Sequence, residues 1–270
     1  MLKKQIILFR FHSEFDICRE RIKILKYFNP KIPMYGLFGG DRSDWGMVKK
    51  ILHDSPLEEI YISTSTDRYW KWLHPEHTLR EWYQLYGHNL QFDFLFDEEW
   101  DILPTAPFSK LYTKQPGFKS IALTGVEDFD KVKDIWRWVS DKSHSEDFIK
   151  FQKYIKEAFQ VEKILHASLG PGQIFTRQFL DDFASLSLDM TFVNPIVSEI
   201  IYPVVAQILD YKVIDTGFYP GWFNRDEAIR FFNCWYIPIE KNTVIEELKK
   251  KDGRRIFHPV KYQFLLKELI

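Results

Sequence analysis

Three acidic side chains stand at alternate positions in one short run of the chain, at Asp97, Glu99 and Asp101. If this run is an extended strand, all three point to one face, while Glu98 and Trp100 point to the other. Like charges on one face repel one another, so the arrangement favours a cation there. Hard divalent ions such as Mg²⁺ or Mn²⁺ bind carboxylate oxygens and are commonly completed by phosphate oxygens of a substrate. The run therefore indicates a divalent-metal site or, as the alternative, surface acids that pair with Lys or Arg.

Short apolar runs predict the strands that position these acids. Residues 6–9 form a continuous apolar run typical of a strand buried on both faces, and Phe11 extends it. Residues 33–38 and 59–63 indicate a second and a third strand, and residues 92–103 a fourth that contains the acids. Other patterns predict helices at residues 14–28, 45–52, 74–86, 145–159 and 198–209, and further strands at residues 120–123, 173–176 and 212–215.

This alternation predicts an α/β protein with a mostly parallel central sheet and right-handed crossovers. No repeat or low-complexity linker divides the sequence, so we expect a single domain over residues 1–270 whose second half is less regular. Ligands of such sheets bind outside the carboxyl ends of the strands. The polar residues expected at that edge are His12, Asp41, residues 64–67 and the acids of the fourth strand.

The composition argues against several classes of function. Lys and Arg number 37 against 38 Asp and Glu, a net charge of -1, so no overall field draws the chain to nucleic acid. Only 12 glycines are present, and the motifs of dinucleotide-binding proteins, P-loop proteins, serine hydrolases and zincins are missing. The two cysteines, Cys18 and Cys234, suit a reducing, cytoplasmic compartment. No apolar stretch is long enough to span a membrane, and residues 6–9 are too short for a signal peptide, so we expect at most a peripheral membrane contact.

Four short segments form an ordered set along the chain. They are the acids of residues 97–101, Gly-Pro-Gly-Gln-Ile-Phe-Thr-Arg at residues 170–177, Ser-Glu-Ile-Ile-Tyr-Pro at residues 198–203, and Phe-His-Pro-Val-Lys at residues 257–261. The set resembles the nucleotide-sugar-dependent glycosyltransferases of the GT-A fold. In that family these places hold an Asp-X-Asp motif, a turn and strand beside the donor sugar, the catalytic base of inverting members, and a metal-binding His. The resemblance implies a GT-A-like three-layer α/β/α sandwich, with a nucleotide-sugar-binding half at residues 1–125 and an acceptor-side half at residues 126–270.

The resemblance also implies a reaction, the transfer of a sugar from a nucleoside-diphosphate sugar, here expected to be a UDP-sugar, to a hydroxyl of a glycan or lipid-linked glycan. Mn²⁺ or Mg²⁺ held by Asp101 and His258 would neutralise the charge that develops on the leaving diphosphate. Glu99 would bind the ribose or the donor sugar, or reach the metal through water. The first acid of the motif is here a Glu, which is longer than the family's Asp, so Asp97 with Glu99 is an alternative functional pair.

Glu199 is the candidate for the base that removes the acceptor's proton in an inverting transfer. It lies in the first turn of a predicted helix with Ser198 as the N-cap, where the helix dipole favours an ionised carboxylate. An ionised carboxylate can accept a proton from a hydroxyl group. The alternative is that Glu199 only adds charge to the start of the helix.

Four residues at the ends of the first two strands are expected to contact the nucleotide. Phe11 would stack on the base, and His12 lies beside it in the sequence. Gly40 and Asp41 follow the second strand, and the Asp41 carboxylate would accept a hydrogen bond from the base or ribose. The alternatives are that Phe11 packs in the core and that Asp41 stabilises a turn.

Contacts to the two sugars are expected from the second half of the chain. Gly170, Pro171 and Gly172 would lie beside the donor sugar, and Trp222, in a turn-like context, would stack on the acceptor. The basic run at residues 249–255 is expected to be solvated surface, or else to contact the diphosphate or an anionic lipid-linked acceptor.

A second pair of residues has a spacing compatible with a metal. His74 and His77 lie three residues apart and share one face of a predicted helix. His74 falls at the helix cap, and the sequence brings no third ligand into view.

Two other functions are alternatives to glycosyl transfer. A nucleotidyltransferase could share an α/β core and an acidic metal site, but the glycine-rich loop with an Arg that normally follows its first strand is missing here. A carbohydrate-binding protein without catalytic activity could use the aromatic residues, which make up 17% of the chain, as its binding face.

Overall fold

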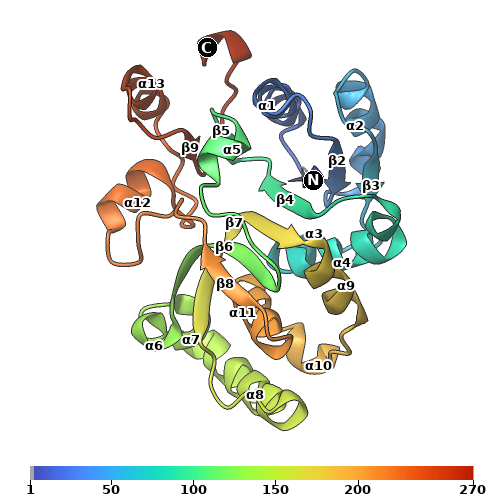
Figure 1. Ribbon diagram of the computed structural model, residues 1–270, viewed down its shortest axis with the longest axis vertical. Helices are drawn as coiled ribbons and strands as arrows, with labels where there is room; N and C mark the ends of the chain where they lie inside the picture. Colours follow the sequence, from blue (N-terminus) through green and yellow to red (C-terminus); the bar gives the residue numbers. More distant parts are fainter. Residues whose placement is uncertain (1–2, 270) are drawn as a thin grey trace.

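The computed structural model describes residues 3–269 and has one large mixed sheet at its centre (Figure 1). Over those residues the sheet has seven strands in the order β3-β2-β1-β4-β7-β6-β8, and β5 and β9 form a separate pair. The strands are β1 Gln5–Phe11, β2 Met34–Phe38, β3 Ile60–Ile62, β4 Phe94–Glu99, β5 Leu103–Pro104, β6 Ser120–Asp128, β7 His166–Thr176, β8 Lys212–Asp215 and β9 Ile256–Phe257.

Helices connect and cover the strands. The α-helices are α1 Phe15–Phe28, α2 Trp45–Leu52, α3 Arg68–Leu73, α4 Pro75–Leu85, α5 Phe108–Leu111, α6 Phe129–Val132, α7 Arg137–Ser140, α8 Lys142–Phe159, α9 Arg177–Ser185, α10 Met190–Val193, α11 Ser198–Ile208, α12 Arg225–Phe231 and α13 Lys241–Lys249. Short 3₁₀ turns are η1 Arg42–Asp44, η2 Gly87–Asn89 and η3 Leu266–Glu268. The predicted helices and strands are confirmed in type, whereas α3, α5, α6, α7, α9, α10, α12 and α13 have no counterpart among the predicted helices.

The direction of the strands confirms the predicted α/β class with a mostly parallel sheet. Strands β3, β2, β1 and β4 pair in parallel, and so do β6 and β8. Strand β7 runs antiparallel to both of its neighbours, β4 and β6. The carboxyl ends of β1, β2 and β4 therefore meet at one edge of the sheet, where ligands of parallel sheets bind.

The alternation of β1 explains the three layers. Ile7 and Phe9 are fully buried against the apolar faces of α1 and α2, whereas Ile6 and Leu8 belong to the core on the opposite face, under α4, α8, α9 and α11. Both faces of the strand are thus covered, which is why residues 6–9 are a continuous apolar run. The three-layer α/β/α arrangement expected from the sequence is confirmed.

Two boundaries near the acids differ from the sequence-based expectation. The fourth strand ends at Glu99, and Asp101 lies in a turn closed by a hydrogen bond from the Ile102 N–H to the Glu99 carbonyl. Asp101 therefore does not continue the alternation of Asp97 and Glu99. The break occurs because β1, the neighbour of β4, itself ends at Phe11, and the last contact between the two strands is the Trp100 N–H donating to the Arg10 carbonyl.

The small-residue segment Gly170 to Gly172 was expected to be a turn and is instead part of β7. Its pairing with β6 is irregular, with shifts of register on either side of Thr124. Gly172 has a φ of +72°, a conformation that favours glycine, and this lets the strand continue through the irregularity.

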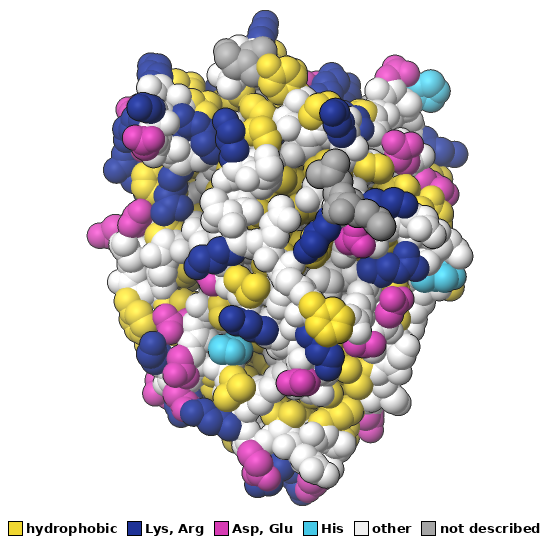
Figure 2. All heavy atoms as spheres, viewed as in Figure 1, with side chains coloured by type: hydrophobic (Ala, Val, Ile, Leu, Met, Phe, Trp, Pro, Cys, Tyr) yellow, Lys and Arg dark blue, Asp and Glu magenta, His cyan; other side chains and the backbone are white. Residues whose placement is uncertain are grey.

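The surface carries both signs of charge. On the face shown in Figure 2, basic and acidic side chains are interspersed, in keeping with the net charge of -1. Among the helices of residues 3–269, none is long and apolar enough to cross a membrane.

Candidate active site

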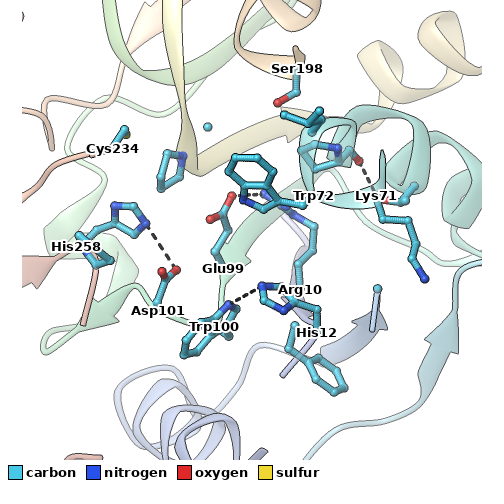
Figure 3. A pocket seen from close by; sticks show the side chains of 18 of the residues that line it. Arg10, His12, Lys71, Trp72, Glu99, Trp100, Asp101, Ser198, Cys234 and His258 are labelled. Carbon is cyan, nitrogen blue, oxygen red and sulfur yellow. Dashed lines mark hydrogen bonds and ion pairs between the residues drawn. The ribbon is translucent and has the colours of Figure 1, made fainter. Parts of the chain in front are cut away.

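A cavity of about 520 Å³ lies at the carboxyl edge of the sheet (Figure 3). Its volume is in the range of a site for a small molecule or cofactor. Its walls come from the ends of β1, β2 and β4, from α3 and the start of α4, from the middle of β7, from the start of α11, and from the segment after β9. Of the residues singled out from the sequence, it is lined by Phe11, His12, Glu99, Asp101, Gly170, Pro171, Glu199 and His258.

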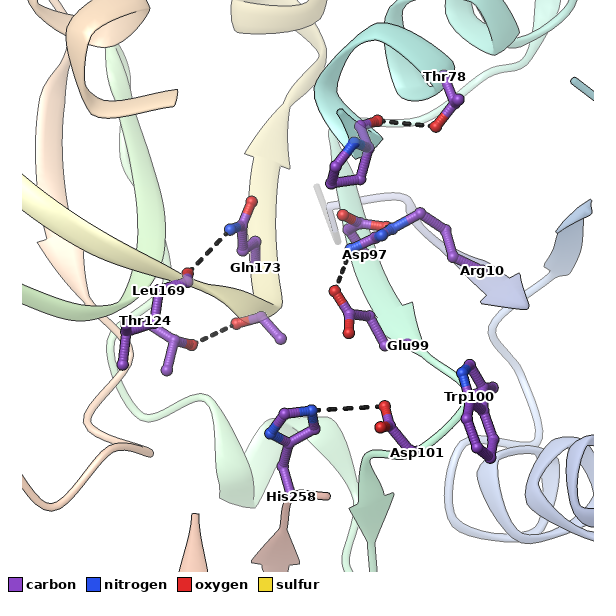
Figure 4. Close-up of polar contacts among 12 residues, drawn as sticks. Arg10, Thr78, Asp97, Glu99, Trp100, Asp101, Thr124, Leu169, Gln173 and His258 are labelled. Atoms are coloured by element: carbon purple, nitrogen blue, oxygen red, sulfur yellow. Dashed lines mark hydrogen bonds and ion pairs between the residues drawn. The ribbon is translucent and has the colours of Figure 1, made fainter. Parts of the chain in front are cut away.

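Arg10 is the cation that neutralises two of the acids (Figure 4). Its Nε lies 2.6 Å from Oδ1 of Asp97, and its Nη2 lies 2.8 Å from Oε1 of Glu99. The predicted alternation of the strand is confirmed, because Asp97 and Glu99 share this partner whereas Glu98 lies on the other face and accepts a hydrogen bond from Tyr112. Asp97 is fully buried, and burial raises its pKa, with Arg10 opposing the rise. Of the two acids that pair with Arg10, Asp97 is buried and does not line the cavity, whereas Glu99 lines it.

We expect Arg10→Met to lower the free energy of unfolding by about 3–5 kcal/mol, because it leaves the Asp97 carboxylate buried without a counter-charge. Arg19→Met is the matched control, since Arg19 pairs with Asp16 at the surface and its loss should cost at most about 1 kcal/mol. Both are measured by denaturant unfolding. Arg10→Met combined with Asp97→Leu should regain much of the loss, and a loss in Arg10→Met no larger than in Arg19→Met would contradict the assignment.

Three ligand-type side chains converge on one wall of the cavity. One ligand atom each of Glu99, Asp101 and His258 lies within 4.8 Å of the other two. Nε2 of His258 is 3.4 Å from Oδ1 of Asp101 (Figure 4), and this Oδ1, although buried, makes no hydrogen bond to any residue of 3–269. Two carboxylates and an imidazole, with one buried carboxylate oxygen that makes no hydrogen bond to the described residues, suit a divalent cation such as Mn²⁺ or Mg²⁺.

The second small sheet brings His258 to Asp101. Strand β9 pairs antiparallel with β5, which follows Asp101 directly, and the Val260 N–H donates to the Asp101 carbonyl at 2.7 Å. Nδ1 of His258 lies 2.7 Å from the backbone carbonyl oxygen of Asn233, so Nδ1 carries a proton and donates it. When the imidazole is neutral, the lone pair of Nε2 then faces Asp101, as in a metal-ligating histidine held by an outer partner.

The pKa values of this pair shift in opposite directions. Burial alone would lower the pKa of His258, but the Asp101 carboxylate raises it above its ordinary value. Burial would raise the pKa of Asp101, and the His258 imidazolium lowers it. A cation bound here must displace the proton from His258, so its affinity rises with pH.

Glu199 reaches the cavity from the start of α11. The N-cap of this helix is Val197, and Ser198 is the first helical residue, so the predicted Ser198 cap is wrong. Burial raises the pKa of Glu199 to about 7, and the positive charge of Arg137 opposes the rise. The prediction that the start of the helix keeps this carboxyl group ionised is therefore wrong, because the effect of burial is larger than that of the helix dipole. The pKa of Glu199 instead lies near neutrality, where a general base is most effective.

The residues expected around the nucleotide lie in different settings. His12 lines the cavity; its Nε2 accepts a hydrogen bond from the Trp100 indole at 3.2 Å, and burial lowers its pKa to about 4. Phe11 also lines it but is only 2% exposed, and its ring centroid lies 5.3 Å from that of Phe38. Most of the Phe11 side chain therefore packs in the core, as the alternative predicted. Asp41 is exposed and accepts from the Ser43 N–H in a turn, as its alternative predicted.

Gly40 and Gly172 support the cavity wall without being among the described residues that line it. A Cβ on Gly40 would lie 2.4 Å from the His12 carbonyl oxygen, so only glycine fits this close approach. The Gly40 carbonyl accepts a hydrogen bond from Nζ of Lys71 at 2.8 Å, and Lys71 does line the cavity.

Trp222 is half-buried and is not among the described residues that line the cavity. Its indole N–H donates to the Gly125 carbonyl at 2.8 Å, and its ring packs edge-on against Trp136. The tryptophans that line the cavity are instead Trp72, Trp100 and Trp138. Spacing in the sequence could not separate these from the core tryptophans, because their exposure depends on how α3 and α7 close over the sheet.

Sequence reasoning also missed the cations of the cavity. Arg10, Arg68, Lys71 and Lys261 line it, and the sequence analysis assigns none of them a role in binding a ligand. Lys261 ends the Phe-His-Pro-Val-Lys segment, two residues after Pro259, which is the one signal that could have marked it. The basic run at residues 249–255 serves other contacts: Arg254 pairs with Glu227, and Arg255 donates to backbone carbonyl groups.

The fold and site together define an α/β protein with a carboxylate–histidine site at the carboxyl edge of its sheet. No protein-family model matches the chain, and no curated protein sequence matches it either. Among solved structures, it is similar to the bifunctional glycosyltransferase WbbM (10% identity, 97% of this chain, 47% of that chain, TM-score 0.46). It is similar to the galactosyltransferase LgtC, solved with donor and acceptor sugar analogues (11% identity, 77% of this chain, 72% of that chain, TM-score 0.41). It is also similar to 4-diphosphocytidyl-2C-methyl-D-erythritol synthase (9% identity, 80% of this chain, 89% of that chain, TM-score 0.43).

The chain thus spans about half the length of WbbM. These similar structures include glycosyltransferases, as the sequence resemblance implies. With TM-scores below 0.5, the likeness assigns no activity to this chain, so its function is argued from the geometry of the site.

Proposed function

We propose that the protein transfers a sugar from a nucleoside-diphosphate sugar to an acceptor hydroxyl, with a divalent metal ion as cofactor. The observation that carries this proposal is the meeting of Glu99, Asp101 and His258 in a cavity that Glu199 also lines. These residues come from three of the four segments that resemble GT-A glycosyltransferases. Gly170 and Pro171, from the remaining segment, line the same cavity, which supports a common purpose for the set.

Asp101 and His258 would hold the ion, with Glu99 beside them directly or through water. A bound Mn²⁺ or Mg²⁺ would supply positive charge for the diphosphate that leaves the donor sugar. Oδ1 of Asp101 makes no hydrogen bond to another described residue and faces Nε2 of His258, and the His258 imidazole is held in this orientation by Asn233, which supports these two residues as the ligands. Arg10 fixes Glu99 through the 2.8 Å ion pair and so limits how far its carboxylate can turn.

Three cations of the cavity suit the donor's diphosphate. Arg68 and Lys71 lie on α3, and Lys261 lies in the segment after β9. Guanidinium and ammonium groups bind phosphate oxygens by charge-assisted hydrogen bonds. The nucleotide would then extend along the ends of β1 and β2, near His12, and we propose UDP as its nucleoside diphosphate.

Glu199 would act as the base that takes the proton from the acceptor hydroxyl, in a single displacement that inverts the configuration at the sugar carbon. Trp72, Trp138 and Tyr236 offer aromatic faces in the cavity on which an acceptor sugar can stack. They replace Trp222 in that role. The configuration of the product, determined by NMR, decides between inversion and retention.

The pKa of Glu199 predicts how the rate depends on pH. The unprotonated carboxylate is the active form, so kcat should rise with pH through a midpoint at or below about 7, because a cation bound near Glu99 would lower the pKa further. The measurement is kcat at saturating donor and metal over the acid-to-neutral range. A rate that falls as the pH rises through this range would contradict the role of Glu199 as a base.

The experiment that tests the function is an assay of purified protein with Mn²⁺ or Mg²⁺ against a panel of UDP- and GDP-sugars. A glycosyltransferase releases nucleoside diphosphate, and more of it when the acceptor is present. A nucleotidyltransferase instead forms a sugar nucleotide from a nucleoside triphosphate and releases pyrophosphate. If no nucleotide raises the melting temperature, with or without metal, the proposal is wrong.

A further inference from the structure

A second cluster of ligand-type side chains lies away from the cation-binding wall, at the corner between α3 and α4. His74 is the N-cap of α4, and Glu76 and His77 lie in its first turn. All three are buried, with exposed fractions of 2%, 0% and 8%. One ligand atom of each lies within 4.8 Å of the other two.

The spacing of these atoms matches a tetrahedral metal site. Oε1 of Glu76 is 3.1 Å from Nδ1 of His74, with which it shares a hydrogen bond, and 3.6 Å from Nε2 of His77. Ligand bonds of about 2.0–2.2 Å at tetrahedral angles place neighbouring ligand atoms roughly 3.3 Å apart. His74 can meet Glu76 because, as the N-cap, it has non-helical angles (φ -124°, ψ 54°) that turn its side chain toward the helix.

Two of the polar atoms in this cluster lack a partner. Oε2 of Glu76 and Nε2 of His77 make no hydrogen bond to other described residues, although both side chains are more than nine-tenths buried. Leaving such groups unpaired is costly, so an occupant that binds them would stabilise the fold.

The surroundings provide a fixed geometry and an opening. The Trp70 ring stacks on the His77 ring, with centroids 5.5 Å apart and planes 7° from parallel, which holds the imidazole in place. His77 also lines a cavity of about 290 Å³ together with Ser65 and Glu81, through which water and an ion can enter.

We propose that His74, Glu76 and His77 form a second metal site, of the zinc type, with a fourth position open to the small cavity. Two imidazoles and one carboxylate favour zinc, whereas the two carboxylates and one imidazole of the first site favour Mn²⁺ or Mg²⁺. The Glu76 carboxylate offsets the unfavourable positive end of the α4 dipole. The ion would fix the corner that carries Lys71 and Trp72, both in the wall of the large cavity.

The test uses the full chain with the first site removed by Asp101→Asn and His258→Ala. After treatment with a chelator, this variant should bind one equivalent of zinc in competition with a chromophoric chelator, and zinc should raise its melting temperature. Adding His77→Gln or Glu76→Gln should weaken zinc binding by more than the roughly 10- to 100-fold typical of losing an outer partner of a ligand. His53→Gln is the control, because His53 is exposed and pairs with its neighbour Asp54.

A spectroscopic measurement that leaves the cluster intact guards against variants that fail to fold. Co²⁺ bound to the variant with the first site removed should show the intense visible absorption of tetrahedral cobalt. The proposal is overturned if that variant shows no such absorption and binds no zinc, or if zinc binding is the same after His77→Gln and Glu76→Gln in correctly folded protein.

Discussion

Glu199→Gln should lower kcat for sugar transfer by about 10²–10⁴-fold, the range that general-base catalysis contributes, while nucleotide and metal affinities stay unchanged. Gln has nearly the same shape as Glu and can occupy the same place at the start of α11, but its amide cannot accept the acceptor's proton. The change therefore removes an interaction of the transition state and not of the bound donor. Initial rates with saturating UDP-sugar and calorimetric titration with UDP and Mn²⁺ measure the two effects separately.

Glu157→Gln is the matched control, because Glu157 lies on α8 with its side chain 67% exposed and should not affect turnover. Glu199→Asp keeps the carboxylate but withdraws it by one methylene, so partial activity is expected there. If the Glu199→Gln variant has a near-normal kcat, Glu199 is not the base. That result would leave the proposed metal site to be tested separately.

Asp101→Asn should abolish the metal dependence of nucleotide binding and lower kcat by about 10²–10³-fold, the cost of losing one preorganised group that stabilises developing charge. The amide keeps the size of the side chain but cannot offer a charged oxygen to a cation, and it also removes the ion pair with His258 at 3.4 Å. Titration of UDP in the presence and absence of Mn²⁺ measures the change, and circular dichroism checks that the fold is kept.

His258→Ala should have a similar effect, and the double variant should cost little more than either single one, because ligands of one ion act as a unit. His53→Ala is the control for the loss of an imidazole, since that side chain is 81% exposed. If Asp101→Asn still binds UDP more tightly with Mn²⁺ than without it, the ion is held elsewhere and Asp97 with Glu99, the alternative pair, would have to be considered again.

Much of the fold follows from local patterns in the sequence. The continuous apolar run at residues 6–9 predicts a strand buried on both faces, and it lies at the middle of the sheet as β1. The Pro at position 75 with an acid after it predicts a helix start, and α4 begins at that residue. Such features depend on residues that lie a few positions apart in the chain, so they can be recognised in a single sequence.

The boundaries near the site were harder to predict because they depend on partners elsewhere in the chain. The acids at residues 97–101 have an alternating pattern throughout, yet β4 ends at Glu99, just before its last hydrogen bond to β1, from the Trp100 N–H to the Arg10 carbonyl. The glycines at residues 170–172 suggest a turn, but β7 continues through them, because Leu169 and Ile174 on either side both pair with β6. In both cases the pairing of strands outweighed the local preference.

The sequence by itself therefore determined which residue types stand at the ends of which strands, and with them the candidate metal ligands and base. Only the tertiary structure decided which of these residues lie together and which contacts each of them makes. The register of β1 against β4 places Arg10 opposite Glu99, and the pairing of β5 with β9 carries His258 to Asp101. Contacts between distant segments are set by register and packing, which the spacing along one chain does not encode. Glu199 shows the same division: its place in a first helical turn is local, but its pKa near 7 comes from burial under the folded chain.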